Sequence, residues 1–399
     1  MPLTRLSRSR LLLAGAVWLG VLIVQVFNWG GGGTKALALL LLLVGTGALT
    51  LSAQPSSPLE SGSWNRALLA ACGALLAVHL GFLAKQMGHP NLLDIATTTL
   101  AAGRALLEGG NPYALPLDRE AVRMTGDAAF QGYKYLPMMA ITYLPLGTWL
   151  GARGLLATNL ILQLATICLV YRLGARVGSR NAGLAAVLFY LSLPIAMRQV
   201  LGKGATDLVA VVPLLAALLT VERRPALSGF FAGLSISAKL LPGILLLPCA
   251  LPAAGRRWPY LAGVAVGLLP TLVFIVISPV ELFDNVILFN ATRVPDSTSW
   301  LALAPPIAES AARLVFVASV AALCLFVWRR APSLPVRCGL LAGMILLAIL
   351  SGPAAHHNYH LWWLPLVSVL VGLMVVQETA LRNPLAVKTA PIRVDRLRL

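Results

Sequence analysis

Charged residues are scarce in this sequence. Asp, Glu, Lys and Arg make up 11% of its 399 residues, whereas soluble domains contain about 25%. Apolar residues make up 58%, and the mean hydropathy is +0.82. Apolar runs of about 18 residues recur along the chain, and such runs are long enough to cross the hydrocarbon core of a bilayer. The composition therefore excludes a soluble globular protein and predicts a polytopic membrane protein.

The sequence also lacks an alternating strand pattern and paired cysteines, which limits the possible folds. No stretch alternates apolar and polar residues as strands do, so the membrane spans are expected to be helices and not the strands of a barrel. Cysteines are few and scattered in or beside apolar runs, without ligand spacing or an obvious pair, so neither a disulfide framework nor a metal site is indicated. These cysteines are Cys72, Cys168, Cys249, Cys324 and Cys338.

Acidic residues are the rarer charged class. The chain has 14 Asp and Glu against 31 Lys and Arg, which gives a net charge of +17. In a soluble protein this excess would suggest nucleic-acid binding, but in a membrane protein it is typical of cytoplasmic loops. We therefore expect no nucleic-acid partner. Internal similarity is also absent, which argues against a secondary transporter built from inverted repeats.

The positions of the basic residues predict a topology with both termini in the cytoplasm. Residues 1–66 are expected to form an N-terminal helical hairpin and linker, residues 67–377 a transmembrane catalytic core, and residues 378–399 a basic cytoplasmic tail. The fold class is all-α, with about twelve transmembrane helices. Core spans are expected at 67–84, 155–171, 182–197, 205–221, 260–277, 311–328, 338–350 and 361–377, with a broken pair of short helices at 226–251.

The longest polar interval, residues 85–153, is expected to lie outside. Its apolar part, residues 136–150, is short and contains Pro137 and Pro145, so we interpret it as a juxtamembrane helix in the outer leaflet. In this arrangement most acidic residues fall outside, as do four histidines. These are His89, His356, His357 and His360. This bias indicates that the working surface is external.

Several polar residues are candidates for chemistry. Asp94, at the outer membrane edge, is a candidate general base; the alternatives are a solvated carboxylate or a helix N-cap. Lys134 lies between Tyr133 and Tyr135, where it could meet a lipid phosphate or serve only as a membrane anchor. Lys239 lies between two short helices within the membrane, so it should have a partner. A lipid phosphate would suit it, and a salt bridge or snorkelling is the alternative.

The histidine cluster and Asp207 allow two interpretations each. His356, His357 and His360 could bind a metal, but no acidic residue or cysteine nearby in sequence completes such a site. We prefer hydrogen bonds from these histidines to a phosphate or a sugar. Asp207 could contact sugar hydroxyls, or it could be the buried ion-pair partner of Lys203 or Arg198.

Taken in order, these motifs resemble the C-type (GT-C) membrane glycosyltransferases. The motifs are an external Asp94, Gly109-Gly-Asn-Pro-Tyr113, Tyr133-Lys-Tyr-Leu-Pro-Met138 and a following Tyr-Leu-Pro-Leu146. Within that class the chain is most similar to the bacterial polyprenol-phosphate-mannose-dependent α-mannosyltransferases, although Pro137-Met138-Met139 stands where that branch has Pro-Pro-Leu. The resemblance extends from about Asp94 to Gln377.

The resemblance implies a lipid-monophosphate sugar donor, Asp94 as the base, and transfer without an essential metal or cofactor. We predict that one group of residues binds the donor phosphate and another binds the sugar or acceptor. The first group is Lys239, His356, His357, His360 and Lys134; the second is Tyr113, Tyr133, Tyr135, Asp207 and Lys203.

The predicted function is transfer of a sugar, mannose in the first instance, to a lipid-linked or glycan acceptor. Transfer would occur with inversion on the outer face of the bacterial cytoplasmic membrane, where membrane lipids surround the protein. A polyprenyl-lipid flippase or transporter, and an O-antigen ligase or polymerase, are the alternatives because they also handle polyprenyl lipids. A structural scaffold would not need the external bias of acids and histidines.

Overall fold

The computed structural model describes residues 62–115, 132–295, 299, 301, 305–354 and 356–382. Within these residues the chain is helical and has no strand, which confirms the all-α class. The expected N-terminal hairpin, part of the polar loop (residues 116–131) and most of the basic tail lie outside the described residues.

Three described helices are long and apolar enough to cross a membrane: α3 (Gly62–Gly88), α7 (Ala152–Val177) and α16 (Pro306–Arg330). Two bent pairs bring the number to at most five. They are α8 (Arg180–Ser192) with η2 (Ala196–Gly202), and η3 and α12 (Ala254–Gly267) with α13 (Leu269–Ile277). The expected count of about twelve is therefore not confirmed by the described part of the chain.

Prolines explain the two bends. Leu193 precedes Pro194 and has an extended backbone (φ −84°, ψ 113°), as expected for a residue whose α conformation would clash with the proline ring. The chain bends there by 65°. At the second bend, of 52°, Pro270 lacks the N–H that would continue the hydrogen-bond ladder. Each of the two apolar runs was expected to form a single span, and neither bend was anticipated.

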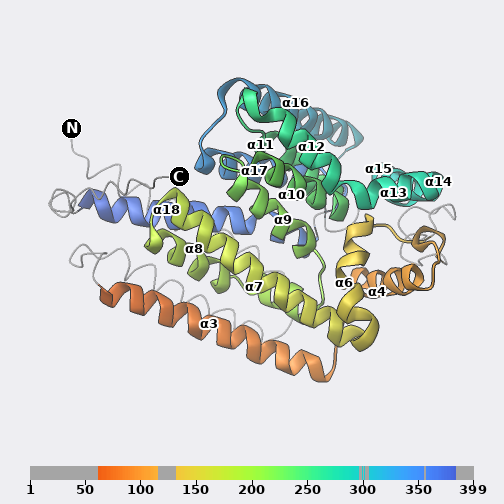
Figure 1. The fold of residues 1–399 in the computed structure, drawn as a ribbon, viewed down its shortest axis with the longest axis horizontal. Coiled ribbons are helices and arrows are strands. Elements are labelled where there is room, and N and C mark those ends of the chain that lie inside the picture. The colour runs from red at the N-terminus through yellow and green to blue at the C-terminus, as the bar shows by residue number, and fades with distance from the viewer. Residues whose placement is uncertain are drawn as a thin grey trace.

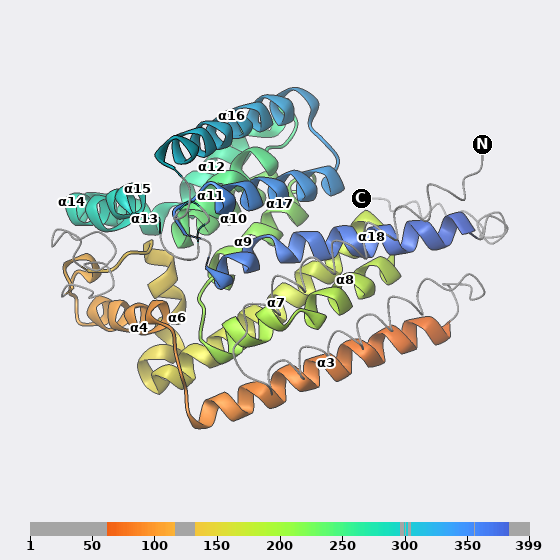
Figure 2. The same ribbon diagram turned by 180° about the vertical axis from the view of Figure 1, so that it is seen from behind.

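Helix α8 is the centre of one group of helices. It packs against α3, α7 and α18 (Leu364–Arg382), and Figures 1 and 2 show these helices side by side. Every residue of α8 from Asn181 to Ser192 is buried, as expected for a helix that is apolar on all sides. A Cβ on Gly174 of α7 would lie 2.9 Å from the Cα of Gly183, so these glycines allow the two backbones to approach closely.

The second group contains α9 (Leu208–Thr220), α10 (Pro225–Ala238), α11 (Leu240–Cys249), α12 (Arg257–Gly267) and α17 (Leu334–Leu350). Lys239 separates α10 from α11 in an extended conformation (φ −142°, ψ 124°). The Tyr260 hydroxyl donates to the Leu247 carbonyl at 3.1 Å, and the Tyr260 carbonyl lies against Gly229 near the start of α10. The end of α11 thus returns to the start of α10, which confirms the predicted broken pair.

The polar loop folds around two helices, α4 (Asp94–Leu107) and α6 (Pro137–Leu150). They pack against each other and lie together beyond one end of α3 (Figure 2). Gly151 (φ 54°, ψ −128°) separates α6 from α7, and Leu146 of α6 lies against Gly154 of α7. Residues 137–150 thus form a helix distinct from α7, as expected, and their depth in the membrane stays a prediction.

Candidate active site

The two tyrosine-containing motifs dock onto each other. Gly132 has φ +88°, and a Cβ there would lie 2.2 Å from the Tyr113 carbonyl oxygen, so glycine is required. The Tyr133 N–H donates to the Pro112 carbonyl at 3.2 Å, and the Tyr113 hydroxyl donates to the Tyr135 carbonyl at 3.0 Å. Tyr113 and Tyr133 are buried in the core. They fix the backbone that carries Tyr135, and their contact with a sugar stays a prediction.

Asp94 is exposed at the first position of α4. Leu93 is the N-cap residue and makes no side-chain cap, so the N-cap interpretation of Asp94 is not supported. A carboxylate in the first turn interacts favourably with the helix dipole. The Leu93 N–H donates to the Lys203 carbonyl at 2.8 Å, which attaches the start of α4 to the segment leading to Asp207.

A buried ion pair lies where that segment meets the α10–α11 break. The Lys239 Nζ is 2.5 Å from the Asp207 Oδ1, and the two side chains are 8% and 0% exposed. The Trp362 Nε1 donates to the same oxygen at 2.6 Å, and the Asn358 Nδ2 donates to Oδ2 at 2.8 Å. Both carboxylate oxygens therefore have donors, which a buried charge requires.

This pairing settles two expectations. The salt bridge considered for Lys239 is present, and the proposed pairing of Asp207 with Lys203 or Arg198 is wrong. The break between α10 and α11 presents Lys239 at the start of α9, whereas Lys203 lies on the loop beside α4. Sequence reasoning missed Asn358 and Trp362 as partners of Asp207. Their only signal was their place within and just after the histidine motif.

Three aromatic rings surround the Lys239 ammonium group. The ring centroids of Tyr135, Tyr359 and Trp362 lie 5.7, 5.5 and 5.1 Å from Nζ, within the range of cation–π attraction. Tyr359 and Trp362 are themselves stacked at 4.5 Å. Burial and then the charge of Asp94 raise the pKa of Tyr135 well above its usual value, with smaller contributions from Tyr359, Tyr133 and Asp207. Tyr135 therefore lies beside the ion pair, and the charge of Asp94 acts on it.

The histidines lie at the start of η6 (His357–Trp362), the short 3₁₀ helix that precedes α18. The His356 Nε2 is 2.9 Å from the Arg293 Nη2. Burial and then the nearby Arg198 lower the pKa of His357, and burial and then His357 lower that of His360 to about 4. Both imidazoles are thus neutral at pH 7. Among the described residues, no three His, Cys, Asp or Glu side chains converge as metal ligands.

Lys134, the remaining predicted phosphate ligand, is 8% exposed. Its Nζ lies 5.1 Å from the ring centroid of Phe289. The structure thus places Asp94, Tyr135, Asp207, Lys239 and η6 in one region, with Lys134 beside Tyr135 in sequence.

A family model for glycosyltransferase family 87 matches residues 133–353 of this chain. The chain belongs to glycosyltransferase family 87. The protein is therefore a membrane glycosyltransferase, which confirms the general class that the motifs predicted. The matched region begins at Tyr133 and contains Tyr135, Asp207 and Lys239, whereas Asp94 precedes it. The comparisons with curated proteins and with solved structures gave no match.

Proposed function

We propose that this family 87 glycosyltransferase moves a sugar from a polyprenyl-monophosphate donor to a lipid-linked or glycan acceptor, and that the sugar is mannose. The active site faces the extracytoplasmic side of a bacterial cytoplasmic membrane. The observation that supports this proposal is that a buried cation, Lys239, lies over the ring of Tyr135, on which the charge of an exposed carboxylate, Asp94, also acts. A lipid-phosphate donor needs a cationic group at membrane depth, and its acceptor needs a base at the surface.

The depth of the ion pair suits such a donor. Asp207 directly precedes the 13 residues of α9, which rise about 20 Å along the helix axis. The hydrocarbon core is about 30 Å thick. If α9 ends at the cytoplasmic boundary and runs straight across the membrane, its first residue, and with it Asp207 and Lys239, lies below the opposite surface. Such a position would match a phosphate drawn slightly into the membrane by its polyprenyl chain.

In the proposed reaction, Asp94 accepts the proton of the acceptor hydroxyl as that oxygen attacks the anomeric carbon. The bond between the anomeric carbon and the phosphate oxygen breaks, and polyprenyl phosphate leaves with the electron pair. Because attack and departure occur on opposite faces, a β-linked donor gives an α-linked product. The proposal assigns no metal or cofactor.

The remaining residues are assigned to binding. Lys239 and Lys134 attract the phosphate electrostatically, and His356, His357 and His360 supply hydrogen bonds. The imidazoles with lowered pKa act as neutral N–H donors. Tyr113, Tyr133, Tyr135, Lys203 and Asp207 are assigned to the sugar and acceptor side, with Tyr135 the best placed because its ring lies 5.7 Å from the Lys239 ammonium group.

The test is sugar transfer by the purified protein in detergent and in liposomes. A panel of polyprenyl-phosphate sugars is supplied with membrane glycolipid acceptors, and product is detected by mass spectrometry. We expect transfer from at least one donor of this class. Transfer from a nucleotide sugar alone would contradict the donor assignment, and movement of the lipid across liposomes without transfer would favour the flippase alternative.

A further inference from the structure

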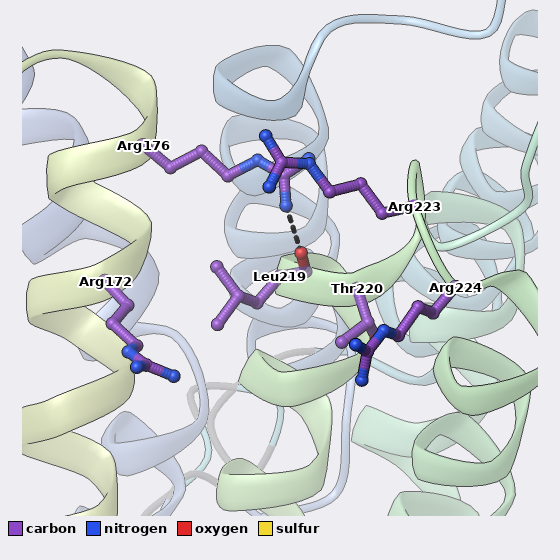
Figure 3. A pocket seen from close by; sticks show the side chains of 6 residues that line it. All are labelled: Arg172, Arg176, Leu219, Thr220, Arg223 and Arg224. Atoms are coloured by element: carbon purple, nitrogen blue, oxygen red, sulfur yellow. Dashed lines mark hydrogen bonds between the residues drawn. The ribbon is translucent and has the colours of Figure 1, made fainter. Parts of the chain in front are cut away.

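A cavity of about 500 Å³ lies at the opposite end of α9 from the Asp207–Lys239 pair. Four arginines line it together with Leu219 and Thr220; they are Arg172, Arg176, Arg223 and Arg224. Figure 3 shows Arg172 and Arg176 extending from α7 towards Arg223 and Arg224 at the far side. We call these four residues and the space between them the arginine cavity. The proposed sugar transfer uses none of these four arginines.

One of the four arginines is held in place by the protein. Arg176 donates to the Leu219 carbonyl, and its Nη2 is 2.7 Å from the Glu222 carboxylate. Arg256 faces the same turn, because its Nη1 donates to the Glu222 carbonyl at 2.5 Å. Within the described residues, the side chains of Arg172, Arg223 and Arg224 make no hydrogen bond or ion pair. Glu222 therefore leaves most of the positive charge uncompensated.

Two ordinary explanations account for only part of this arrangement. Basic residues collect in cytoplasmic loops, but that bias does not require four of them to line one cavity. The negative end of the α9 dipole favours a nearby cation, and Arg176 at the Leu219 carbonyl already satisfies it. Like charges repel when brought together, so the remaining arginines would be stabilised by an anion.

We propose that the arginine cavity binds the phosphate group of an anionic ligand. Guanidinium groups bind phosphate through paired hydrogen bonds, and the volume is typical of small-ligand sites, which span about 300–1,000 Å³. The phosphate belongs either to the headgroup of an anionic lipid in the adjoining leaflet or to a soluble phosphate compound. This site is separate from the proposed sugar transfer.

The two sources are tested on the full chain. One arm measures binding of phosphatidic acid to the protein in phosphatidylcholine nanodiscs by native mass spectrometry. The other measures binding of pyrophosphate to the protein in detergent by calorimetry, and then asks whether pyrophosphate displaces phosphatidic acid. Displacement identifies the phosphate group itself as the ligand, whereas lipid binding that resists pyrophosphate identifies the headgroup in its leaflet. Either outcome supports the cavity.

Matched variants distinguish a site from general attraction to charge. Arg223→Gln/Arg224→Gln removes two cavity arginines, and Arg329→Gln/Arg330→Gln removes two exposed ones at the end of α16. We expect the cavity variant to bind at least about tenfold more weakly, the loss of a charge-assisted hydrogen bond or more. If that variant does not fold, Arg172→Gln replaces it. Absence of binding to both probes, or equal losses in the two double variants, would overturn the proposal.

Discussion

At the scale of single residues, Asp94 is the group on which the proposed reaction depends. Positioned base catalysis contributes roughly 10²–10⁴-fold, so Asp94→Asn should lower turnover by about that factor. The amide is nearly isosteric and lies on the acceptor side, so donor affinity should change little. Initial rates at saturating donor measure the effect, and NMR of the product reports its anomeric configuration.

Glu108 provides the control for Asp94. It is an exposed carboxylate at the other end of the same helix, so Glu108→Gln should keep wild-type turnover. Full activity of Asp94→Asn, or retention at the anomeric carbon, would refute the assignment of Asp94 as the base of an inverting transfer.

The Asp207–Lys239 pair predicts a separation between stability and donor use. Lys239→Ala leaves Asp207 buried without its partner, which costs about 3–5 kcal/mol for a pair of this kind. The double variant Lys239→Met/Asp207→Asn removes both charges and should recover most of the lost stability. If Lys239 also binds the donor phosphate, the double variant should still have a raised KM for donor. Thermal unfolding and donor kinetics measure the two effects, and recovery of both would leave the pair a purely structural role.

His360 predicts how stability responds to acid. Its Nδ1 accepts from the Trp363 Nε1 at 3.2 Å, and burial, then the nearby His357, lower its pKa to about 4. The unfolded chain, with a pKa near its usual 6.5, binds the proton more readily. Stability should therefore be constant above about pH 6.5 and fall as the pH decreases towards 4. In His360→Gln this part of the decline should disappear from unfolding curves; an unchanged decline would place its origin in other groups.

At the scale of elements, sequence features predicted the boundaries that prolines, glycines and charges mark. The break at Lys239, the return of α11 and the separation of α6 from α7 at Gly151 were all anticipated. The bends beside Pro194 and Pro270 were not, because the apolar runs continue through both prolines and outweigh them in a hydropathy count. The partners of Asp207 were also missed, since Asn358 and Trp362 lie about 150 residues away and pairing at such distance depends on tertiary packing.

The contact between the two tyrosine motifs should be disrupted by the addition of a single methyl group at Gly132. Gly132→Ala would place a Cβ 2.2 Å from the Tyr113 carbonyl oxygen at a positive φ. Gly109→Ala is the matched control, because Gly109 also has a positive φ (+72°) but has open space around it. The free energy of unfolding of the control should fall by only about 1–2 kcal/mol, the cost of a left-handed backbone conformation for alanine. Gly132→Ala should lose more stability and also activity, by thermal unfolding and transfer assays. Equal losses would contradict the docking of the two motifs.

At the scale of the whole molecule, the two ends of the helices carry opposite chemistry. One end holds Asp94, Asp207 and the histidines of η6, and the other holds the arginine cavity, Arg256 and Arg257. The positive-inside bias places the arginine end in the cytoplasm and Asp94 outside. Membrane orientation decides which leaflet supplies the donor. This orientation can be tested without knowing which sugar is transferred.

Cysteine accessibility in intact cells provides that test. Ala114 and Ala253 are exposed at the Asp94 end and the arginine end respectively, and the exposed Cys168 and Cys324 are first replaced by serine. A membrane-impermeant maleimide should label Ala114→Cys in intact cells and Ala253→Cys only after the membrane is made permeable. The arginines of α7, of the α9–α10 turn and of α12 gather at one end of the molecule. A reversed membrane orientation would therefore require this whole end to face outward. Labelling of Ala253→Cys in intact cells, with Ala114→Cys protected, would therefore overturn both the topology and the extracytoplasmic active site.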